Sequence, residues 1–260
     1  MRDPAVLTPV QRAIAVMRKR YDEPLPLPEL ASEALLSPFH FARTFRRETG
    51  VSPGRYLTAV RLYEAKRLLL TTDLTVADIS CRVGYSSVGT FTTRFTGTVG
   101  VPPNRYRQLP RDSVLAIADG WRTLPRALPD QAEGQSDGPT GSLIGRYRTP
   151  SGETLSRVFV GVFDGPIPQR CPVRCSLLSG MGAAGWRIDE VPPGLWTVVA
   201  MASRVNGESA SYLVGTSTPV QVRAGVTTAV AGVLRRPRPS DPPILLTVVS
   251  TDAALAGKAC

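Results

Sequence analysis

The chain has 260 residues, a formal net charge of +10 and 42% hydrophobic residues, so it can build one large domain or two ordinary ones and is not expected to be disordered. No apolar stretch approaches the roughly 18–20 residues of a membrane span, and the N-terminus lacks an apolar signal core, so we expect a cytoplasmic protein with no membrane partner. Four cysteines are too few for a disulfide framework, and a single histidine, His40, excludes two-histidine metal motifs.

The N-terminal part of the chain is predicted to be helical and basic. Apolar residues recur at helical spacing in the segments 9–21, 27–36, 54–70 and 75–83. In the third segment the face predicted to be buried consists of Tyr56, Ala59, Val60, Tyr63 and Leu70. Up to Arg111 there are 17 basic against 9 acidic residues, a net charge of +8, whereas the remainder holds 14 against 12. A basic region of this kind attracts nucleic acid, although simple solubility is the alternative.

A shift of 50 residues aligns part of the helical region with itself. Seven identities fall within 16 positions, and each pair does the same structural job. In each copy two Phe lie four residues apart on one helix face, a Gly ends that helix, and a Pro opens the next one. The pairs are Phe41/Phe91, Phe45/Phe95, Gly50/Gly100, Val51/Val101, Pro53/Pro103, Arg55/Arg105 and Tyr56/Tyr106. The region is therefore predicted to contain two copies of a helix–turn–helix unit.

The second helix of each unit presents an outward face of different chemistry. The face opposite Phe41 and Phe45 carries Phe39, His40, Arg43, Arg46 and Arg47. These groups suit a DNA major groove, because Arg can bond guanine bidentately and Phe can contact a thymine methyl. The matching face of the second unit is small and uncharged, with Gly89, Thr90, Thr93 and Thr96, and with Arg94 at its flank. An ordinary helix-bundle surface is the alternative interpretation.

The chain resembles the AraC/XylS family of transcription regulators over about residues 8–109, in LPELASEALLSPFHFARTFRRETGVSPGRYL and TVADISCRVGYSSVGTFTTRFTGTVGVPPNRYR. The resemblance implies two helix–turn–helix units joined by a long helix, with recognition helices in successive major grooves about 34 Å apart. It implies base contacts at Phe39, His40, Arg43, Gly89, Thr92 and Thr93. Phosphate contacts are expected at Arg46, Arg47 and Arg94, and core or turn positions at Tyr85, Phe91, Phe95, Val101, Pro103 and Tyr106.

The chain departs from the family pattern in two respects. Many relatives carry polar or basic residues at the base-reading positions of the second recognition helix, where this chain has Val88, Gly89 and Thr93. We therefore expect the first unit to specify sequence and the second mainly to position the protein. Many relatives also place the effector or dimerisation domain before the DNA-binding domain, whereas here the additional domain follows it, so the family's ligand-pocket rules do not transfer.

The C-terminal part is predicted to be an all-β sandwich. Residues 112–142 are assigned to a linker because 124–142 is rich in Pro, Gly, Ser and acidic residues, although 112–123 could also extend the helical part. Short β-branched runs follow over 143–250 and suggest about seven strands. The predicted strands include LIGRYRT, SRVFVGVF, GLWTVVAMAS, PVQVR, TTAVAGVL and ILLTVV. The segment GWRIDEVPPGLWTVVAMA is similar to transthyretin-like or carboxypeptidase-regulatory-like modules, which are usually non-catalytic.

Few residues of the second domain suggest chemistry. Asp189 and Glu190 are adjacent, so in a strand they would point to opposite faces, and a solvated strand end is expected. Cys171 and Cys175 could form a redox switch across a turn, although unpaired thiols are the default and a zinc site is not expected. Cys81 is predicted to be buried in the helical core. Trp121, Trp186 and Trp196 could line a ligand pocket, but core packing is the simpler expectation.

Taken together, the sequence favours a sequence-specific transcription regulator that binds a double-stranded DNA operator and associates with the nucleoid when bound. A small-molecule effector and a homodimer are further expected partners, and the C-terminal domain is the candidate module for either. A non-specific architectural DNA binder is the first alternative, and a ligand- or protein-binding β module with a vestigial DNA domain is the second. We expect no enzymatic activity, cofactor or metal, because no nucleophile or acid–base set converges.

Overall fold

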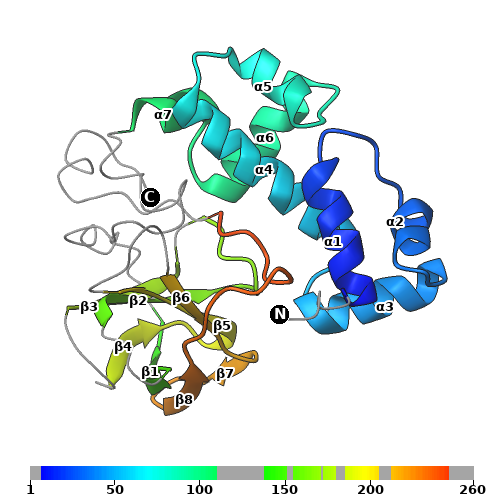
Figure 1. The fold of residues 1–260 in the computed structure, drawn as a ribbon. Helices are drawn as coiled ribbons and strands as arrows, with labels where there is room; N and C mark the ends of the chain where they lie inside the picture. The colour runs from blue at the N-terminus through cyan, green and yellow to red at the C-terminus, as the bar shows by residue number, and fades with distance from the viewer. Residues whose placement is uncertain are drawn as a thin grey trace.

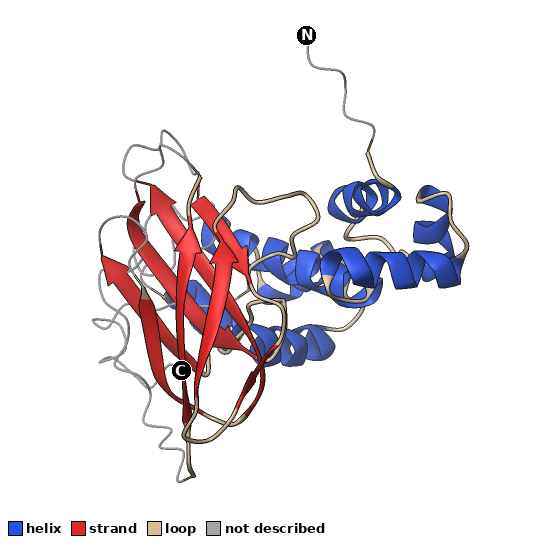
Figure 2. Cartoon of the chain, turned by 90° about the horizontal axis from the view of Figure 1, so that it is seen from below, coloured by secondary structure: helices blue, strands red, loops and turns tan. Residues whose placement is uncertain are grey.

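The structure is a computed structural model that describes residues 7–109, 138–150, 155–170, 172–179, 185–204 and 212–245. Figure 1 shows helices in the N-terminal part and strands in the C-terminal part, and Figure 2 shows the two parts beside each other from below. The predicted fold class, an all-α double helix–turn–helix domain followed by an all-β sandwich domain, is confirmed. Within the described ranges, no helix is long and apolar enough to cross a membrane.

The helical domain is built from two similar units in which caps fix the helix ends. Its helices are α1 (Pro9–Lys19), α2 (Leu27–Glu33), α3 (Pro38–Thr49), α4 (Pro53–Thr71), α5 (Val76–Arg82), α6 (Val88–Val99) and α7 (Pro103–Gln108). Gly50 and Gly100 end α3 and α6 in the left-handed conformation, with φ of 78° and 97°. Pro53 and Pro103 open α4 and α7, where a missing N–H costs little. The repeat therefore predicts these helix boundaries correctly.

The core of each unit is the same aromatic triad. In the first unit the rings of Phe41 and Phe45, and of Phe45 and Tyr56, lie edge-on with centroids 5.4 Å apart. In the second unit the corresponding residues, Phe91, Phe95 and Tyr106, have centroid separations of 5.6 Å for both pairs. All six side chains are fully buried. Three of these four ring pairs are edge-to-face, and the Phe91–Phe95 pair is tilted. Such contacts add to the burial of apolar area, so the repeated residues hold each unit together.

Two predictions about the helical core are wrong. Helix α4 is not buried on one face only, because Leu57, Leu62, Ala65, Lys66, Leu68 and Leu69 are buried in addition to the predicted face, and Tyr63 on that face is only partly buried. Both units and the C-terminal domain pack around this helix, so most of its circumference is covered. Cys81 is exposed rather than buried. On α5 the residues facing the core are its neighbours Ile79 and Ser80, with Val83 after the helix.

Corresponding turns in the two units use different residues for the same left-handed conformation. Leu35 follows α2 with φ of 56°, and Gly84 follows α5 with φ of 82°. Gly84 is also required by close packing between the units, because an added Cβ would lie 2.7 Å from the carbonyl oxygen of Asp22. The side chain of Leu35 is 74% exposed, so it gains little from packing in return for its strained backbone.

Replacing Leu35 with glycine is therefore expected to raise the free energy of unfolding by about 0.5–1 kcal/mol. A non-glycine residue in the left-handed region costs about 1–2 kcal/mol, and the greater chain entropy of glycine offsets part of the gain. Urea denaturation would measure the change, with Gly84→Ala as the matched variant expected to be destabilised. A loss of stability in Leu35→Gly would contradict the strain argument.

The C-terminal domain contains eight strands in two sheets among the described residues. They are β1 (Gly141–Arg148), β2 (Leu155–Phe163), β3 (Arg174–Ser179), β4 (Trp186–Val191), β5 (Gly194–Arg204), β6 (Tyr212–Thr216), β7 (Val220–Val222) and β8 (Thr227–Val233). One sheet has the order β4-β1-β8, and the other has β3-β2-β5-β6 with β7 paired to β5. Strands β1 and β8 are parallel, whereas β2 pairs antiparallel to both β3 and β5. Ile244 and Leu245, predicted to begin a strand, belong to none.

Two segments of the C-terminal domain pack into the helical domain. We call residues 164–170, between β2 and β3, the bridging loop, and residues 235–245, after β8, the strap; in Figure 1 both extend from the sheets toward the helices. Ile167 and Leu245 are 4% and 1% exposed and belong to the same hydrophobic core as the aromatic triads. The backbone N–H of Leu245 donates to the carbonyl of Pro168 at 2.8 Å. The bridging loop and the strap therefore support each other.

Candidate nucleic-acid interface

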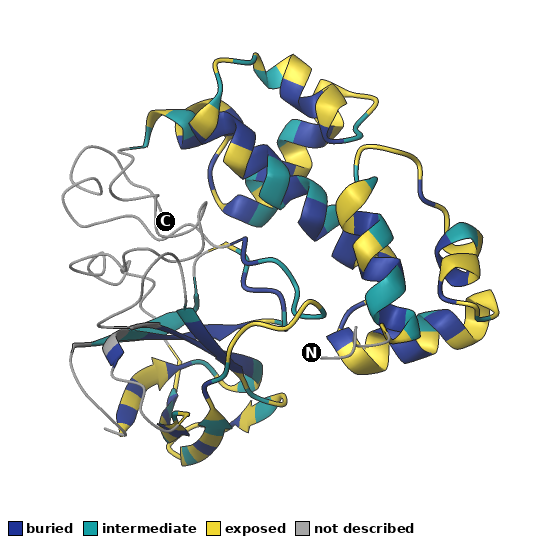
Figure 3. Cartoon of the chain, in the orientation of Figure 1, coloured by how far each residue is buried: buried dark blue, intermediate teal, exposed yellow. Residues whose placement is uncertain are grey.

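The outward face of α3 is exposed and positively charged. Its N-terminus is capped by Ser37, whose hydroxyl accepts from the backbone N–H of His40. Burial of Phe41 and Phe45 turns the opposite side of the helix to solvent (Figure 3). Phe39 is 80% exposed. The other exposed residues of this face are His40, Arg43, Arg46 and Arg47.

At this exposure the ring of Phe39 contributes little to packing among the described residues. No carboxylate of the described residues lies within 4 Å of Arg43, Arg46 or Arg47. Their guanidinium groups are therefore available to phosphates or base edges. The face offers one exposed ring and three cations to a nucleic acid.

The corresponding face of α6 is exposed but nearly uncharged. Ser87 caps the helix by accepting from the backbone N–H of Thr90. Gly89, Thr93 and Arg94 are exposed, whereas Thr92 is only partly so. An added Cβ at Gly89 would meet only the Ser87 hydroxyl, at 3.7 Å, so no contact among the described residues requires glycine there. A smooth surface without side-chain bulk lets the helix backbone approach another molecule closely.

The two units are joined by more than the helix between them. The guanidinium of Arg61, on α4, donates to the carbonyls of Tyr21 and Glu23 in the first unit, at 2.6 and 2.8 Å. Its carbon also lies 5.9 Å from the ring centroid of Tyr85 in the second unit. Burial lowers the pKa of Arg61 from its ordinary value, but not enough to deprotonate an arginine at neutral pH. This side chain connects both units to α4.

Sequence reasoning missed the contacts that hold the strap on α1 and α4. The hydroxyl of Tyr56 lies 3.2 and 3.0 Å from the carbonyl oxygens of Pro239 and Asp241. The guanidinium of Arg18 donates to that hydroxyl and to the carbonyl of Pro239, at 3.3 and 3.1 Å. The only sequence signal was the density of proline in the segment RPRPSDPP, which favours an extended strand of chain with exposed carbonyls.

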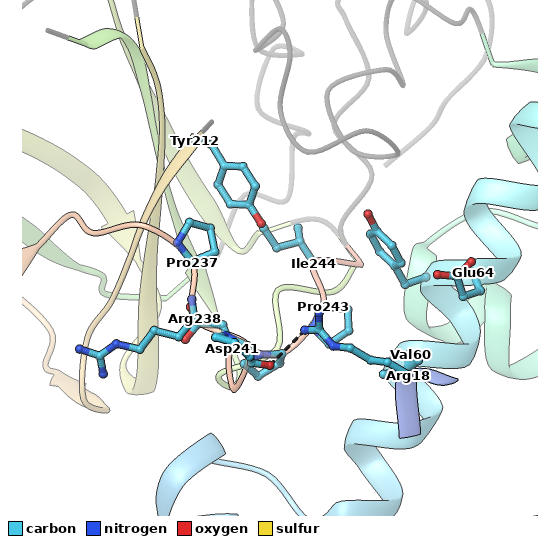
Figure 4. Close-up of a pocket in the computed structure, with 12 residues that line it drawn as sticks. Arg18, Val60, Glu64, Tyr212, Pro237, Arg238, Asp241, Pro243 and Ile244 are labelled. Carbon is cyan, nitrogen blue, oxygen red and sulfur yellow. Dashed lines mark hydrogen bonds between the residues drawn. The ribbon is translucent and has the colours of Figure 1, made fainter. Parts of the chain in front are cut away.

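A cavity of about 450 Å³ lies beneath the strap, between the two domains (Figure 4). Its lining includes apolar walls and four charged residues, Arg18, Glu64, Arg238 and Asp241. Both acidic groups are already paired outside the cavity lining: Glu64 with Arg67 at 2.8 Å, and Asp241 with Arg235 through two bonds of 2.7 Å. No carboxylate of the described residues lies within 4 Å of Arg18 or Arg238. The cavity therefore carries an excess of positive charge.

The candidate chemical residues of the β-sandwich have structural surroundings. Asp189 is exposed and accepts from Arg187 and from the Ser142 hydroxyl, at 2.9 and 2.6 Å, which hold the pKa of its carboxyl below the ordinary value. Glu190 is also exposed, 3.7 Å from Arg174, so the solvated strand end is observed. The described residues contain no cluster of three or more His, Cys, Asp or Glu that could hold a metal ion.

The cysteines and tryptophans that the sequence analysis considered also have structural surroundings wherever the structure describes them. Burial raises the pKa of the Cys175 thiol to about 11, which disfavours a reactive thiolate at neutral pH. Cys171 and Trp121 lie outside the described residues. Trp186 is 3% exposed and belongs to the sandwich core, and the Trp196 indole donates to the carbonyl of Pro192 at 2.8 Å. Neither of these two tryptophans lines the cavity beneath the strap.

Comparison with known proteins identifies the helical part. The profile of a family described as a helix-turn-helix domain matches residues 30–109. An HTH-type transcriptional regulator of Mycobacterium tuberculosis is 41% identical over 80 residues, which are 31% of this chain and 31% of that protein. The bifunctional transcriptional activator/DNA repair enzyme AdaA of Bacillus subtilis is 35% identical over 91 residues, 35% of this chain and 43% of its own length.

Solved structures match over the same part of the chain. One is the DNA-binding domain of AdpA, a global transcriptional factor, in complex with a target DNA. It is 30% identical, with a TM-score of 0.39, and the match covers 40% of this chain and 95% of that one. Another, from Chromobacterium violaceum, is titled as an AraC-type DNA-binding domain-containing transcriptional regulator. It is 25% identical, with a TM-score of 0.38, over 38% of this chain and 89% of that one. The chain spans about a third of the length of the curated relatives first matched, 31–39% of each.

Proposed function

We propose that this chain, whose residues 30–109 match a helix-turn-helix domain family, is a sequence-specific DNA-binding transcription regulator of the AraC type. The observation that carries the proposal is the outward face of α3, where an 80% exposed Phe39 lies among arginines that have no carboxylate partner in the described residues. The curated relatives named above are themselves transcription regulators or activators. We assign the DNA-binding domain to residues 8–111, the linker to 112–142 and the β-sandwich to 143–250.

In this proposal α3 and α6 enter successive major grooves on one side of the duplex. Phe39, His40 and Arg43 contact bases from α3, and Gly89, Thr92 and Thr93 contact bases from α6. Arg46, Arg47 and Arg94 bind phosphates. The exposure of eight of these nine positions and the partial exposure of Thr92 support the assignment, because a buried side chain could not reach a groove. The smooth face of α6 supports a division of labour in which α3 reads sequence and α6 positions the protein.

Selection of bound DNA from a random library by the full-length chain tests this function. We expect one enriched operator whose affinity exceeds that for random duplex by roughly 10³-fold or more and falls steeply with salt. Equal binding to operator and scrambled DNA would instead favour the architectural alternative. No DNA binding by the full chain, together with ligand binding by its C-terminal domain, would favour a β module with a vestigial DNA domain.

For the β-sandwich we propose an effector-binding role at the cavity beneath the strap. A cavity of about 450 Å³ falls within the range of small-molecule sites. Arg18 and Arg238, which have no carboxylate partner in the described residues, and the apolar walls suit an organic carboxylate with an apolar body. Arg18 also donates to the strap, so a ligand that binds this guanidinium competes with the contact between the domains. Dimerisation through the sandwich, which exposes Ile144 and Val233, is the other proposed role and is tested by solution mass.

Phenylacetate, phenylacetamide and phenethylamine form a probe series that differs mainly in charge. We expect only phenylacetate to raise the Tm of the full chain, because only it complements the two arginines. Arg18→Gln is expected to abolish the shift, whereas Arg82→Gln, at an exposed position of α5, is expected to keep it. Equal shifts for all three probes, or none for phenylacetate, would reject the anionic-effector role. Either of these outcomes would leave the DNA-binding proposal unchanged.

A further inference from the structure

One loop of the β-sandwich touches the same turn in both helix–turn–helix units. At the first unit, Pro166 packs on Gly50, where an added Cβ would lie 3.1 Å from the proline Cγ. At the second, the backbone N–H of Arg170 donates to the carbonyl of Thr98 at 2.7 Å, and its guanidinium donates to the carbonyl of Gly97. The Cα of Arg170 also lies 3.8 Å from where a Cβ of Gly100 would be. Both sets of contacts thus lie where a recognition helix ends.

Gly50 and Gly100 are equivalent residues of the 50-residue repeat, so the bridging loop connects matching points of the two units. These points lie at the C-terminal ends of α3 and α6. The proposed base contacts lie in the N-terminal half of each helix, so the loop grips each helix at the end away from its reading residues. The loop therefore contacts both helices away from the proposed base contacts, at the end of α3 that carries the proposed phosphate contacts Arg46 and Arg47.

The loop is held in place by buried contacts. Ile167, at its centre, is 4% exposed and packs in the helical core. The strap supports it from behind through the bond between Leu245 and Pro168. The strap is in turn fixed to α4, because the ammonium of Lys66 on that helix donates to the carbonyl of Leu245 at 3.1 Å. The strap is thus bonded both to α4 and to the bridging loop, so the loop is anchored on α4.

Without the loop, the described connections between the units centre on α4. They include the helix itself, the side chain of Arg61, the contact of Gly84 with Asp22 and the hydrophobic core that the two units share. A pair of bodies joined mainly around one axis can still pivot about it. The bridging loop adds a further point of attachment on each unit, at the ends of α3 and α6, which restricts that movement.

We infer that the β-sandwich domain braces the two helix–turn–helix units, with Pro166, Ile167 and Arg170 as positioning residues that fix the separation of α3 and α6. This inference rests on the proposed function where it concerns DNA. A fixed separation of the two helices makes the protein accept one spacing of half-sites. Inserting one base pair moves a half-site by about 3.4 Å along the duplex and rotates it by about a tenth of a turn.

The brace itself is tested without DNA, by electron–electron distance measurement on the full chain. Spin labels go on Glu33→Cys and Arg82→Cys, exposed positions of α2 and α5, after the four native cysteines are replaced by serine. We expect one narrow distance distribution for the parent and a broadened one for Ile167→Asp, which expels the loop from the core. Val226→Asp, a 46% exposed position elsewhere in the sandwich, is the matched control and should equal the parent. Equal distributions for parent and Ile167→Asp would overturn the brace.

The consequence of the brace for DNA binding is tested by repeating the library selection. We expect a single half-site spacing for the parent and for Val226→Asp, and for Ile167→Asp several spacings that differ by one base pair. Inserting one base pair into the operator should weaken the parent at least tenfold and Ile167→Asp less than threefold. Equal losses would overturn the inferred role in spacing. If the parent enriches no sequence, the proposed function fails, whereas the distance measurement still decides whether the brace exists.

Circular dichroism measures whether Ile167→Asp is folded, and Arg170→Ala gives a milder second variant for both experiments.

Discussion

Replacing Arg43 with alanine is expected to weaken binding to the selected operator by about 1–3 kcal/mol, or roughly 5- to 150-fold, and to relax preference at one base pair. Arg43 is exposed on α3, and no carboxylate of the described residues lies within 4 Å of it. Its guanidinium is therefore free to bond a guanine through two hydrogen bonds, a contact that alanine cannot replace. Titrations of operator and of scrambled duplex at one fixed salt concentration measure the sequence-specific and the non-specific affinity separately.

Thr93→Ala is the matched change on α6 and is expected to cost much less specificity. Its side chain offers one hydroxyl, on a face without a described charge apart from Arg94 at the flank. Arg46→Ala controls for charge, because loss of a phosphate contact weakens all sequences alike and lowers the salt dependence by about one ion. Equal losses of specificity in Arg43→Ala and Thr93→Ala would refute the division of labour between the two helices.

The helical domain was predictable because its determinants are local and repeated. The conformation of Gly50 and Gly100, the prolines that open α4 and α7, and the capping box of Thr75 with Asp78 all follow from rules that act within a few residues. The four-residue spacing of Phe41 and Phe45 likewise fixes which face of α3 is buried, and hence which residues are exposed. The exposure of the proposed site follows from the sequence, while its contacts with DNA remain a prediction.

The surroundings of α4 were not predictable, because they come from residues far along the chain. Lys66 meets Leu245, 179 positions away, and Tyr56 meets Asp241, 185 positions away. Periodicity places a residue on a face of its own helix but does not show that a distant segment covers that face. For this reason the burial of Lys66, which is 1% exposed, does not follow from the pattern of its own helix. The same reasoning explains why Ile244 and Leu245 were assigned to a strand, since apolar residues of a strap and of a strand look alike.

Replacing the buried Lys66 with methionine is expected to remove a large part of the pH dependence of stability. Burial lowers the pKa of Lys66 from its ordinary 10.5 to about 7 in the folded chain. Between these two values the unfolded chain binds more protons than the folded one, so the free energy of unfolding rises with pH. The rise attributable to this group is about 2 kcal/mol between pH 7 and pH 9, and it flattens below pH 7, where both states are protonated.

Two described neighbours of Lys66, Tyr106 and Leu245, do not produce this slope. Its ammonium lies 5.6 Å from the ring centroid of Tyr106, and burial raises the pKa of that phenol above its ordinary value, so the phenol stays neutral in this window. The ammonium also donates to the carbonyl of Leu245, which does not titrate. Methionine has a similar volume and no charge, and it leaves that carbonyl without its donor at a cost of about 1 kcal/mol that does not vary with pH.

The slope, rather than the stability at any single pH, therefore tests the prediction. Urea denaturation at pH 7, 8 and 9 should show the wild type gaining about 2 kcal/mol relative to Lys66→Met across the series. Lys19→Met, at an exposed position of α1, should run parallel to the wild type, because its charge is solvated in both states. Parallel curves for wild type and Lys66→Met would mean that Lys66 keeps its ordinary pKa. The strap would then not shield Lys66 from water.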